Sequence, residues 1–133
     1  MISVLPADRS RVFLVEHDAD SLEMLALYVR ELGYEVVGCF GTMREALAAL
    51  TRTGIDVLIC DLGLPDGDGW ELLRRAGLSP QVCCVALSPF GRSADLPRSE
   101  QAGYYYHLHK PFVPEALSRI LEGCAGKGQS CPA

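Results

Sequence analysis

Six charged or polar side chains lie at or just past the ends of short apolar runs in this sequence. They supply three carboxylates, an imidazole, a hydroxyl and an ammonium, and in chain order they are Glu16, His17, Asp18, Asp61, Ser88 and Lys110. If the apolar runs are parallel strands of one sheet, their carboxyl ends meet at one edge, where ligand chemistry in such a sheet belongs. We therefore expect these side chains to form one polar cluster.

This combination of groups suits the transfer of a phosphoryl group to a carboxylate. A carboxylate such as that of Asp61 can act as the nucleophile. A divalent cation held by neighbouring oxygens would neutralise charge on the incoming phosphoryl oxygens. The ammonium of Lys110 would add a second positive contact, and the hydroxyl of Ser88 could donate a hydrogen bond to the new phosphate.

Strand patterns alternate with helical patterns five times along the chain. The predicted strands are 11–15, 34–39, 56–60, 82–87 and 104–108. Helices are predicted over 21–32, between Thr42 and Gly54, over 70–78, within 91–102 with Pro97 in the first turn, and over 114–123. Because most of the strands are apolar on both faces, they are typical of a parallel sheet covered by helices on both sides. With right-handed crossovers, this predicts an open, doubly wound α/β fold in three layers.

The bulk composition fits one small domain. The 133 residues are 49% hydrophobic, which is enough for one packed core. We expect a single domain over 1–133, with a core of about 11–123 and a flexible tail over 124–133. The net charge of −5 argues against a nucleic-acid surface. No apolar run reaches the ~20 residues needed to span a bilayer, and the start does not resemble a signal peptide, so the expected location is the cytoplasm.

The six cysteines show no spacing typical of a metal site or a redox motif. No C-x-x-C pair occurs, and no cluster of cysteine and histidine has zinc-finger spacing. Four of them lie in or beside apolar runs and two lie near the tail: Cys39, Cys60, Cys83, Cys84, Cys124 and Cys131. We therefore predict free cysteines that serve as small core hydrophobes.

Four segments resemble, in order and spacing, the receiver domain of two-component response regulators. They are VFLVEHDAD, DVLICDLGLPDGDG, VALS and the Lys110-Pro111-Phe112 segment, and the resemblance runs from about residue 11 to 123. It implies a flavodoxin-like (βα)5 fold with a five-stranded parallel sheet. It also implies a signalling module that is not an enzyme beyond catalysing its own phosphorylation. The phosphodonor would be a sensor histidine kinase or a phosphotransfer protein.

The resemblance also implies a role for each matching residue. Those roles are Asp61 as phosphoacceptor, Glu16 as first pocket acid, the carbonyl of Gly63 as a backbone metal ligand, Ser88 as switch hydroxyl, Lys110 as phosphoryl contact with a cis bond to Pro111, and His107 at the second switch position. The metal would be Mg²⁺, bound by Glu16, Asp61 and Gly63.

His17 departs from the family pattern, because it stands where a second metal-binding acid is usual. Magnesium prefers hard oxygen ligands in a near-ideal octahedron, and an imidazole offers nitrogen and no negative charge. We therefore predict weakened Mg²⁺ binding. Asp18 is a candidate substitute ligand, although a role as an N-terminal helix acid is favoured for it. Mn²⁺, which accepts nitrogen more readily, is the alternative ion.

Three functions remain open from the sequence. The first is a phosphorylatable receiver that presents a face of helix four, strand five and helix five to a downstream protein, to its own output domain or to a second copy in a homodimer. The second is a pseudo-receiver that signals by binding alone, which His17 supports. The third is a flavin binder, which Glu16 and Asp18 disfavour because their charges would repel a phosphate. No contact with nucleic acid or membrane is expected, and the chain could be a whole regulator or part of a hybrid kinase.

Overall fold

A five-stranded parallel sheet forms the centre of the protein. The computed structural model describes residues 10–89 and 95–130, and its sheet has the strand order β2-β1-β3-β6-β7. The strands are β1 (Arg11–Val15), β2 (Glu35–Phe40), β3 (Val57–Asp61), β6 (Cys83–Pro89) and β7 (Tyr106–Lys110). A separate two-stranded hairpin joins β4 (Gly63–Leu64) to β5 (Gly67–Asp68). The order reverses direction beside β1 and β3, which places a ligand crevice at the carboxyl ends of these strands.

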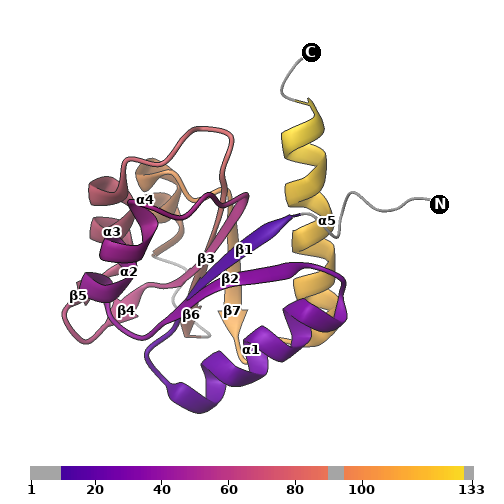
Figure 1. Ribbon diagram of the computed structural model, residues 1–133, viewed down its shortest axis with the longest axis horizontal. Coiled ribbons are helices and arrows are strands. Elements are labelled where there is room, and N and C mark those ends of the chain that lie inside the picture. Colours follow the sequence, from indigo (N-terminus) through magenta and orange to yellow (C-terminus); the bar gives the residue numbers. More distant parts are fainter. Residues whose placement is uncertain (1–9, 90–94, 131–133) are drawn as a thin grey trace.

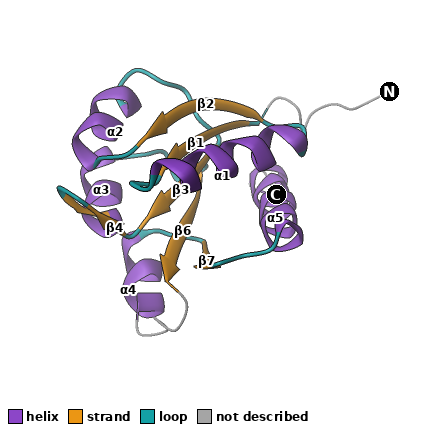
Figure 2. Ribbon diagram, turned by 90° about the horizontal axis from the view of Figure 1, so that it is seen from below, coloured by secondary structure: helices purple, strands orange, loops and turns teal. Residues whose placement is uncertain are grey.

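Helices cover both faces of the sheet. They are α1 (Ala19–Glu31), α2 (Met43–Leu50), α3 (Gly69–Ala76), α4 (Asp95–Ala102) and α5 (Pro114–Ser130). α1 and α5 pack on one face, and α2, α3 and α4 lie on the other (Figures 1 and 2). The predicted doubly wound, flavodoxin-like (βα)5 architecture in three layers is confirmed. None of the helices within 10–89 and 95–130 has the length and apolar character to cross a membrane.

The helix ends follow from local sequence. Asp18 caps α1 by accepting a hydrogen bond from the backbone N–H of Ser21, at 2.9 Å. Gly33 follows α1 with φ +97°, a left-handed conformation that favours glycine. Thr42 caps α2 through the backbone N–H of Glu45. α4 begins two residues before Pro97, so this proline stands in the first turn, as predicted.

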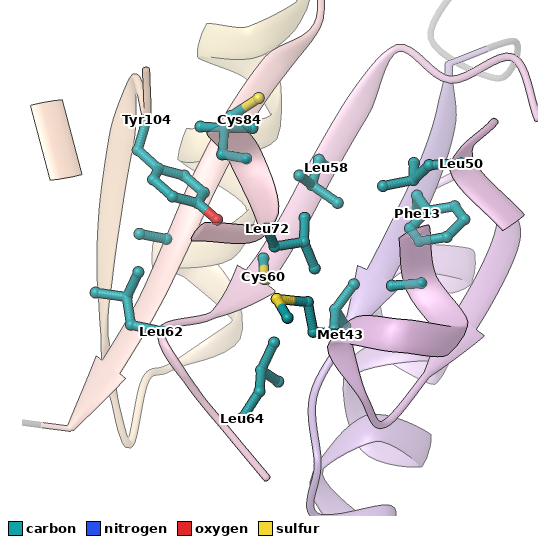
Figure 3. Packing of buried hydrophobic residues seen from close by; sticks show 14 of the residues in the cluster. Phe13, Met43, Leu50, Leu58, Cys60, Leu62, Leu64, Leu72, Cys84 and Tyr104 are labelled. Carbon is teal, nitrogen blue, oxygen red and sulfur yellow. The ribbon is translucent and has the colours of Figure 1, made fainter. Parts of the chain in front are cut away.

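The core consists of two apolar clusters, one on each face of the sheet. Figure 3 shows the cluster under α2 and α3, where Phe13, Leu58 and Leu72 are fully buried. The second cluster lies under α1 and α5 and contains Leu117 and Leu121. All five residues of β3 are buried, as the apolar pattern on both faces predicted. This central strand therefore holds Asp61, its last residue, in a fixed position.

Two predicted ends differ from the structure. The last strand was expected over 104–108, but β7 covers Tyr106–Lys110, because its polar end pairs with β6 up to Pro89. The last helix was expected to stop at Gly123 and to be followed by a flexible tail over 124–133. Instead α5 continues to Ser130, through two further glycines that have low helix propensity.

The prediction of six free cysteines is wrong for one pair. Cys83, at the start of β6, and Cys124, on α5, form a disulfide with their Cα atoms 5.5 Å apart. Cys39, Cys60 and Cys84 are not in disulfide bonds, and Cys131 lies outside the described residues. The two partners are 41 residues apart in the sequence, so spacing carried no signal of the pairing. The disulfide ties α5 to the central sheet.

This disulfide should be visible in the number of reactive thiols. When the protein is denatured without reductant and treated with iodoacetamide, intact mass should show two fewer alkyl groups than after reduction. A peptide map should place the protected pair at Cys83 and Cys124, whereas Cys84, the next residue on the same strand, should react. Equal alkylation with and without reductant would contradict the pairing.

Candidate functional site

The polar cluster predicted from the sequence lies at the carboxyl edge of the sheet. Asp61 ends β3, Glu16 follows β1 directly, and Lys110 ends β7. Glu16 and Asp61 are almost fully buried, with exposed fractions of 1% and 3%. Because the carboxyl ends of parallel strands converge here, residues far apart in the sequence are brought into contact.

Lys110 bridges the two buried carboxylates. Its Nζ atom lies 2.9 Å from Oε1 of Glu16 and 3.0 Å from Oδ2 of Asp61, and it donates a hydrogen bond to each. Charge-assisted hydrogen bonds of this length are stronger than neutral ones. The ammonium therefore compensates much of the negative charge that burial at this edge would otherwise make costly.

The environment shifts the pKa values of both partners of Asp61. Burial raises the pKa of Glu16 above its usual value, although hydrogen bonds from Asp18 N–H and Lys110 oppose this effect. Burial works against the charged form of Lys110, but its hydrogen bonds to Glu16 and Asp61 outweigh burial and raise its pKa. Lys110 is therefore a fixed positive charge in the neutral pH range.

His17 lies at the mouth of the same cluster. Its Nδ1 atom is 3.6 Å from Oε2 of Glu16 and 3.6 Å from Oδ2 of Asp61, and its side chain is 55% exposed. In the described part of the chain, Glu16, His17 and Asp61 form the one group of three side chains spaced to hold a metal ion. Asp18 is exposed, and its carboxylate caps α1 through Ser21.

The hairpin after β3 positions the other side of Asp61. The backbone N–H of Gly63 donates to Oδ1 of Asp61 at 3.1 Å. The carboxylate of Asp66, at the hairpin tip, accepts hydrogen bonds from the backbone N–H groups of Met43 and Arg44 at the start of α2. These hydrogen bonds lower the pKa of Asp66, so the hairpin is anchored to α2 by an ionised carboxylate.

Gly69 packs tightly against the backbone of Asp61, the candidate phosphoacceptor. A Cβ atom at Gly69 would lie 2.8 Å from the carbonyl oxygen of Asp61 and about as close to Leu62. Gly69 N–H also donates to the carbonyl of Leu62, and its own carbonyl accepts a hydrogen bond from the hydroxyl of Tyr104. The residue therefore fits only without a side chain. No pattern in the sequence indicates this contact.

Replacing Gly69 with alanine should destabilise the protein by about 1–3 kcal/mol, because the added methyl group overlaps backbone that a buried strand holds in place. Urea unfolding followed by circular dichroism measures this change. Gly63→Ala is the matched control, since its Cβ atom would meet no atom within 4 Å. Equal unfolding midpoints for the two variants would show that the backbone near Asp61 yields freely.

Ser88 lies buried on β6 and contacts two histidines of β7. Its Oγ atom is 2.8 Å from Nε2 of His107 and 3.5 Å from Nδ1 of His109. The two imidazole rings lie 4.9 Å apart at a tilt of 36°. The hydroxyl predicted as a switch is thus hydrogen-bonded to the residue predicted at the second switch position. The contact to His109 was not predicted.

Trp70 connects the site to α4. Its Nε1 atom donates to Oγ of Ser99, a buried residue of α4, at 2.9 Å, and the guanidinium of Arg98 lies 3.9 Å from its ring centre. Trp70 directly follows Gly69 in α3. Because Trp70 and Ser99 are 29 residues apart, no local pattern in the sequence indicates this contact.

A cavity of about 450 Å³ opens beside the cluster. Its lining joins Glu16 and Lys110 to apolar side chains of α1, such as Met24, and to Phe112 after β7. Met24 is half exposed at this face. An incoming molecule could therefore reach the polar cluster past an apolar wall.

Comparisons with known proteins agree with this geometry. A family model described as "Response regulator receiver domain" matches residues 12–122. The chain is 31% identical to the two-component response regulator ARR11 of Arabidopsis thaliana, over 89% of this chain and 26% of the relative. It is 35% identical to the transcriptional regulatory protein UhpA of Salmonella typhimurium, over 82% of this chain and 57% of the relative. The chain therefore spans only part of these relatives.

Solved structures show the same fold. A CheY-like receiver domain protein from Methanospirillum hungatei superposes with a TM-score of 0.81 at 26% identity, over 91% of this chain and 98% of that one. A receiver domain protein from Clostridium thermocellum superposes with a TM-score of 0.84, over 92% and 99% of the two chains. At 20% identity, the second comparison supports the fold alone.

Proposed function

Since this chain belongs to the response regulator receiver domain family of two-component signalling, we propose that it accepts a phosphoryl group on Asp61. The contact of Lys110 with both Asp61 and Glu16, at 2.9–3.0 Å, carries this proposal. It places a nucleophilic carboxylate, a second acid and a fixed cation in one buried pocket. Receiver domains are generally not classical enzymes, and the domain would catalyse only its own phosphorylation.

The transfer forms one bond and breaks another. A carboxylate oxygen of Asp61 attacks the phosphorus, and the bond from phosphorus to the donor's nitrogen or oxygen breaks, with its electron pair leaving on the donor group. Negative charge then lies on the three phosphoryl oxygens. The ammonium of Lys110, already 3.0 Å from Oδ2 of Asp61, stabilises this charge without having to move into place.

The pocket partly fits the Mg²⁺ ion that receiver domains bind. Glu16 and Asp61 present the hard carboxylate oxygens that Mg²⁺ prefers, and the carbonyl of Gly63 is the third oxygen proposed. The third side chain of the cluster is the imidazole of His17, which fits Mg²⁺ poorly. A bound divalent ion would neutralise charge on the transferred group.

Ser88 is proposed as the switch. If its hydroxyl donates the hydrogen bond to Nε2 of His107 on β7, it would have to give up this bond in order to donate to a phosphoryl oxygen on Asp61. This exchange would change the face formed by α4, β7 and α5. A downstream protein, an output domain of the same polypeptide or a second copy in a homodimer would bind this face.

The phosphodonor is proposed to be a sensor histidine kinase or a phosphotransfer protein, in the cytoplasm. The cavity between α1 and the segment after β7 supports access from this side, because Lys110 lies on its wall and Met24 and Phe112 offer apolar contacts. No role in binding nucleic acid or membrane is proposed for the domain itself.

A pseudo-receiver is the alternative function, and His17 favours it. An imidazole in place of an acid removes one negative charge from the pocket, so the domain would bind metal weakly and signal by protein contact alone. The surface of α4, β7 and α5 would then have one fixed form.

Treatment of the purified protein with a small-molecule acyl phosphate tests the proposal. Intact mass should show one phosphoryl adduct that forms with Mg²⁺ or Mn²⁺, is reduced by chelator and is lost in hydroxylamine, which cleaves acyl phosphates. No adduct with either ion, together with labelling in the His17→Asp variant, would assign the chain to the pseudo-receivers instead.

A further inference from the structure

His17 turns the acidic pocket into a mixed nitrogen and oxygen site. Its Nδ1 atom lies 3.6 Å from one carboxylate oxygen of Glu16 and 3.6 Å from one of Asp61. Ligand atoms about 2.1 Å from an octahedral ion lie about 3.0 Å from their neighbours. Each of these pairs therefore needs to close by about 0.6 Å, and the half-exposed side chain of His17 has room to do so.

Asp18, the other residue that could supply a third ligand, is engaged elsewhere. Its carboxylate caps α1 through the N–H of Ser21, and this hydrogen bond lowers its pKa. Its backbone N–H donates to Oε2 of Glu16 at 3.0 Å, which orients that carboxylate toward the pocket. A swing of Asp18 into the pocket would remove the cap of α1. His17 is therefore the better-placed ligand.

Charge in the pocket disfavours an ion that binds by electrostatics alone. Two carboxylates and the ammonium of Lys110 leave a net charge of −1 when the imidazole is neutral. Mg²⁺ binds mainly through negatively charged or water oxygens and loses its hydration reluctantly. Mn²⁺ has the same charge and the same octahedral oxygen chemistry, and as a transition-metal ion it tolerates one imidazole ligand better than Mg²⁺ does.

We infer that the cluster of Glu16, His17 and Asp61 is a metal site that prefers Mn²⁺ to Mg²⁺ and in which His17 is a direct nitrogen ligand. The inference rests on the proposed function, because it takes this pocket to be the metal pocket of a receiver. It goes beyond that function by assigning a ligand role to His17 and an ion preference to this pocket. Binding can be measured without any phosphoryl transfer.

Mn²⁺ binding to the unphosphorylated protein, followed by the electron paramagnetic resonance of free Mn²⁺, tests the inference. Competition with Mg²⁺ gives the ratio of the two affinities. This ratio should fall about tenfold or more in His17→Asp, which restores a carboxylate. His17→Ala should weaken Mn²⁺ binding about tenfold and change Mg²⁺ binding little. Pulsed measurements on the wild type should detect coupling to an imidazole nitrogen that is absent in His17→Ala.

Two results would overturn the inference. One is an Mn²⁺ affinity that does not change in His17→Ala, and the other is the absence of Mn²⁺ binding in the wild type. Circular dichroism checks the fold of both variants, and both should fold as the wild type does because the side chain of His17 is 55% exposed. If the phosphoryl adduct forms with metal but the Mn²⁺ affinity does not depend on His17, this inference is rejected and the proposed function stands. If Mn²⁺ binds through His17 but no adduct forms, only the proposed phosphorylation is rejected.

Discussion

Replacing Asp61 with asparagine is expected to abolish the phosphoryl adduct completely. The carboxamide keeps the size of the carboxylate, but it is neither charged nor nucleophilic. The amide oxygen of the variant can accept a hydrogen bond from Gly63 N–H or from Lys110, but not from both sides at once. The amide nitrogen then faces the other donor, and that hydrogen bond is lost. Intact mass after treatment with an acyl phosphate and Mg²⁺ or Mn²⁺ measures the loss.

Asp66→Asn is the matched control for this variant. Asp66 lies five residues further along the chain, at the tip of the hairpin of β4 and β5, and its exposed carboxylate binds the backbone of α2 and not the pocket. It should keep the adduct, although weaker hydrogen bonds to α2 should lower the melting temperature. An adduct that persists in Asp61→Asn would place the acceptor on another side chain, and peptide mapping would then locate it.

The position of the site could be predicted because it depends on topology more than on packing. Glu16, Asp61 and Lys110 each stand at the end of a strand, and strands of a parallel sheet end at one edge. The alternation of apolar runs with helical patterns was sufficient to place them together. The fold could be predicted for the same reason, since β3 is apolar from Val57 to Cys60 and must be covered on both faces.

Contacts that depend on register between neighbouring strands could not be predicted. Ser88 is in register with His109, and His107 stands two residues earlier on the same face of β7. The predicted bounds of the two strands fix no register between them, and a shift of two residues would change which imidazole meets the hydroxyl. The hydrogen bond between Ser88 and His107 therefore became visible only in the structure.

Contacts between elements far apart in the sequence could not be predicted either. The disulfide between Cys83 and Cys124 needs β6 and α5 side by side, and no local pattern encodes that approach. The restriction at Gly69 arises because the hairpin folds back onto the carbonyl of Asp61. Turn-forming sequence predicts that a glycine is tolerated there, but not that a side chain is excluded.

Replacing Lys110 with methionine is expected to slow phosphoryl transfer to Asp61 by about 100-fold or more, the range seen when one charge-stabilising donor is removed from an active site. Methionine keeps most of the length of the side chain but leaves Glu16 and Asp61 without their shared cation. The time course of the adduct by intact mass measures the rate. Lys127→Met, the same substitution in α5, is the control and should keep the wild-type rate.

The same variant should lose stability by about 2 kcal/mol at neutral pH, less than for a fully buried pair because Lys110 is 27% exposed. The pKa of Lys110 is raised in the folded protein, so its ammonium stabilises the fold below the unfolded pKa and this stabilisation is lost as pH rises through the folded pKa. Wild type and Lys110→Met should therefore converge in urea unfolding at strongly alkaline pH. If the difference in their free energies of unfolding stayed constant from neutral to strongly alkaline pH, Lys110 would stabilise the fold by packing and not by its charge.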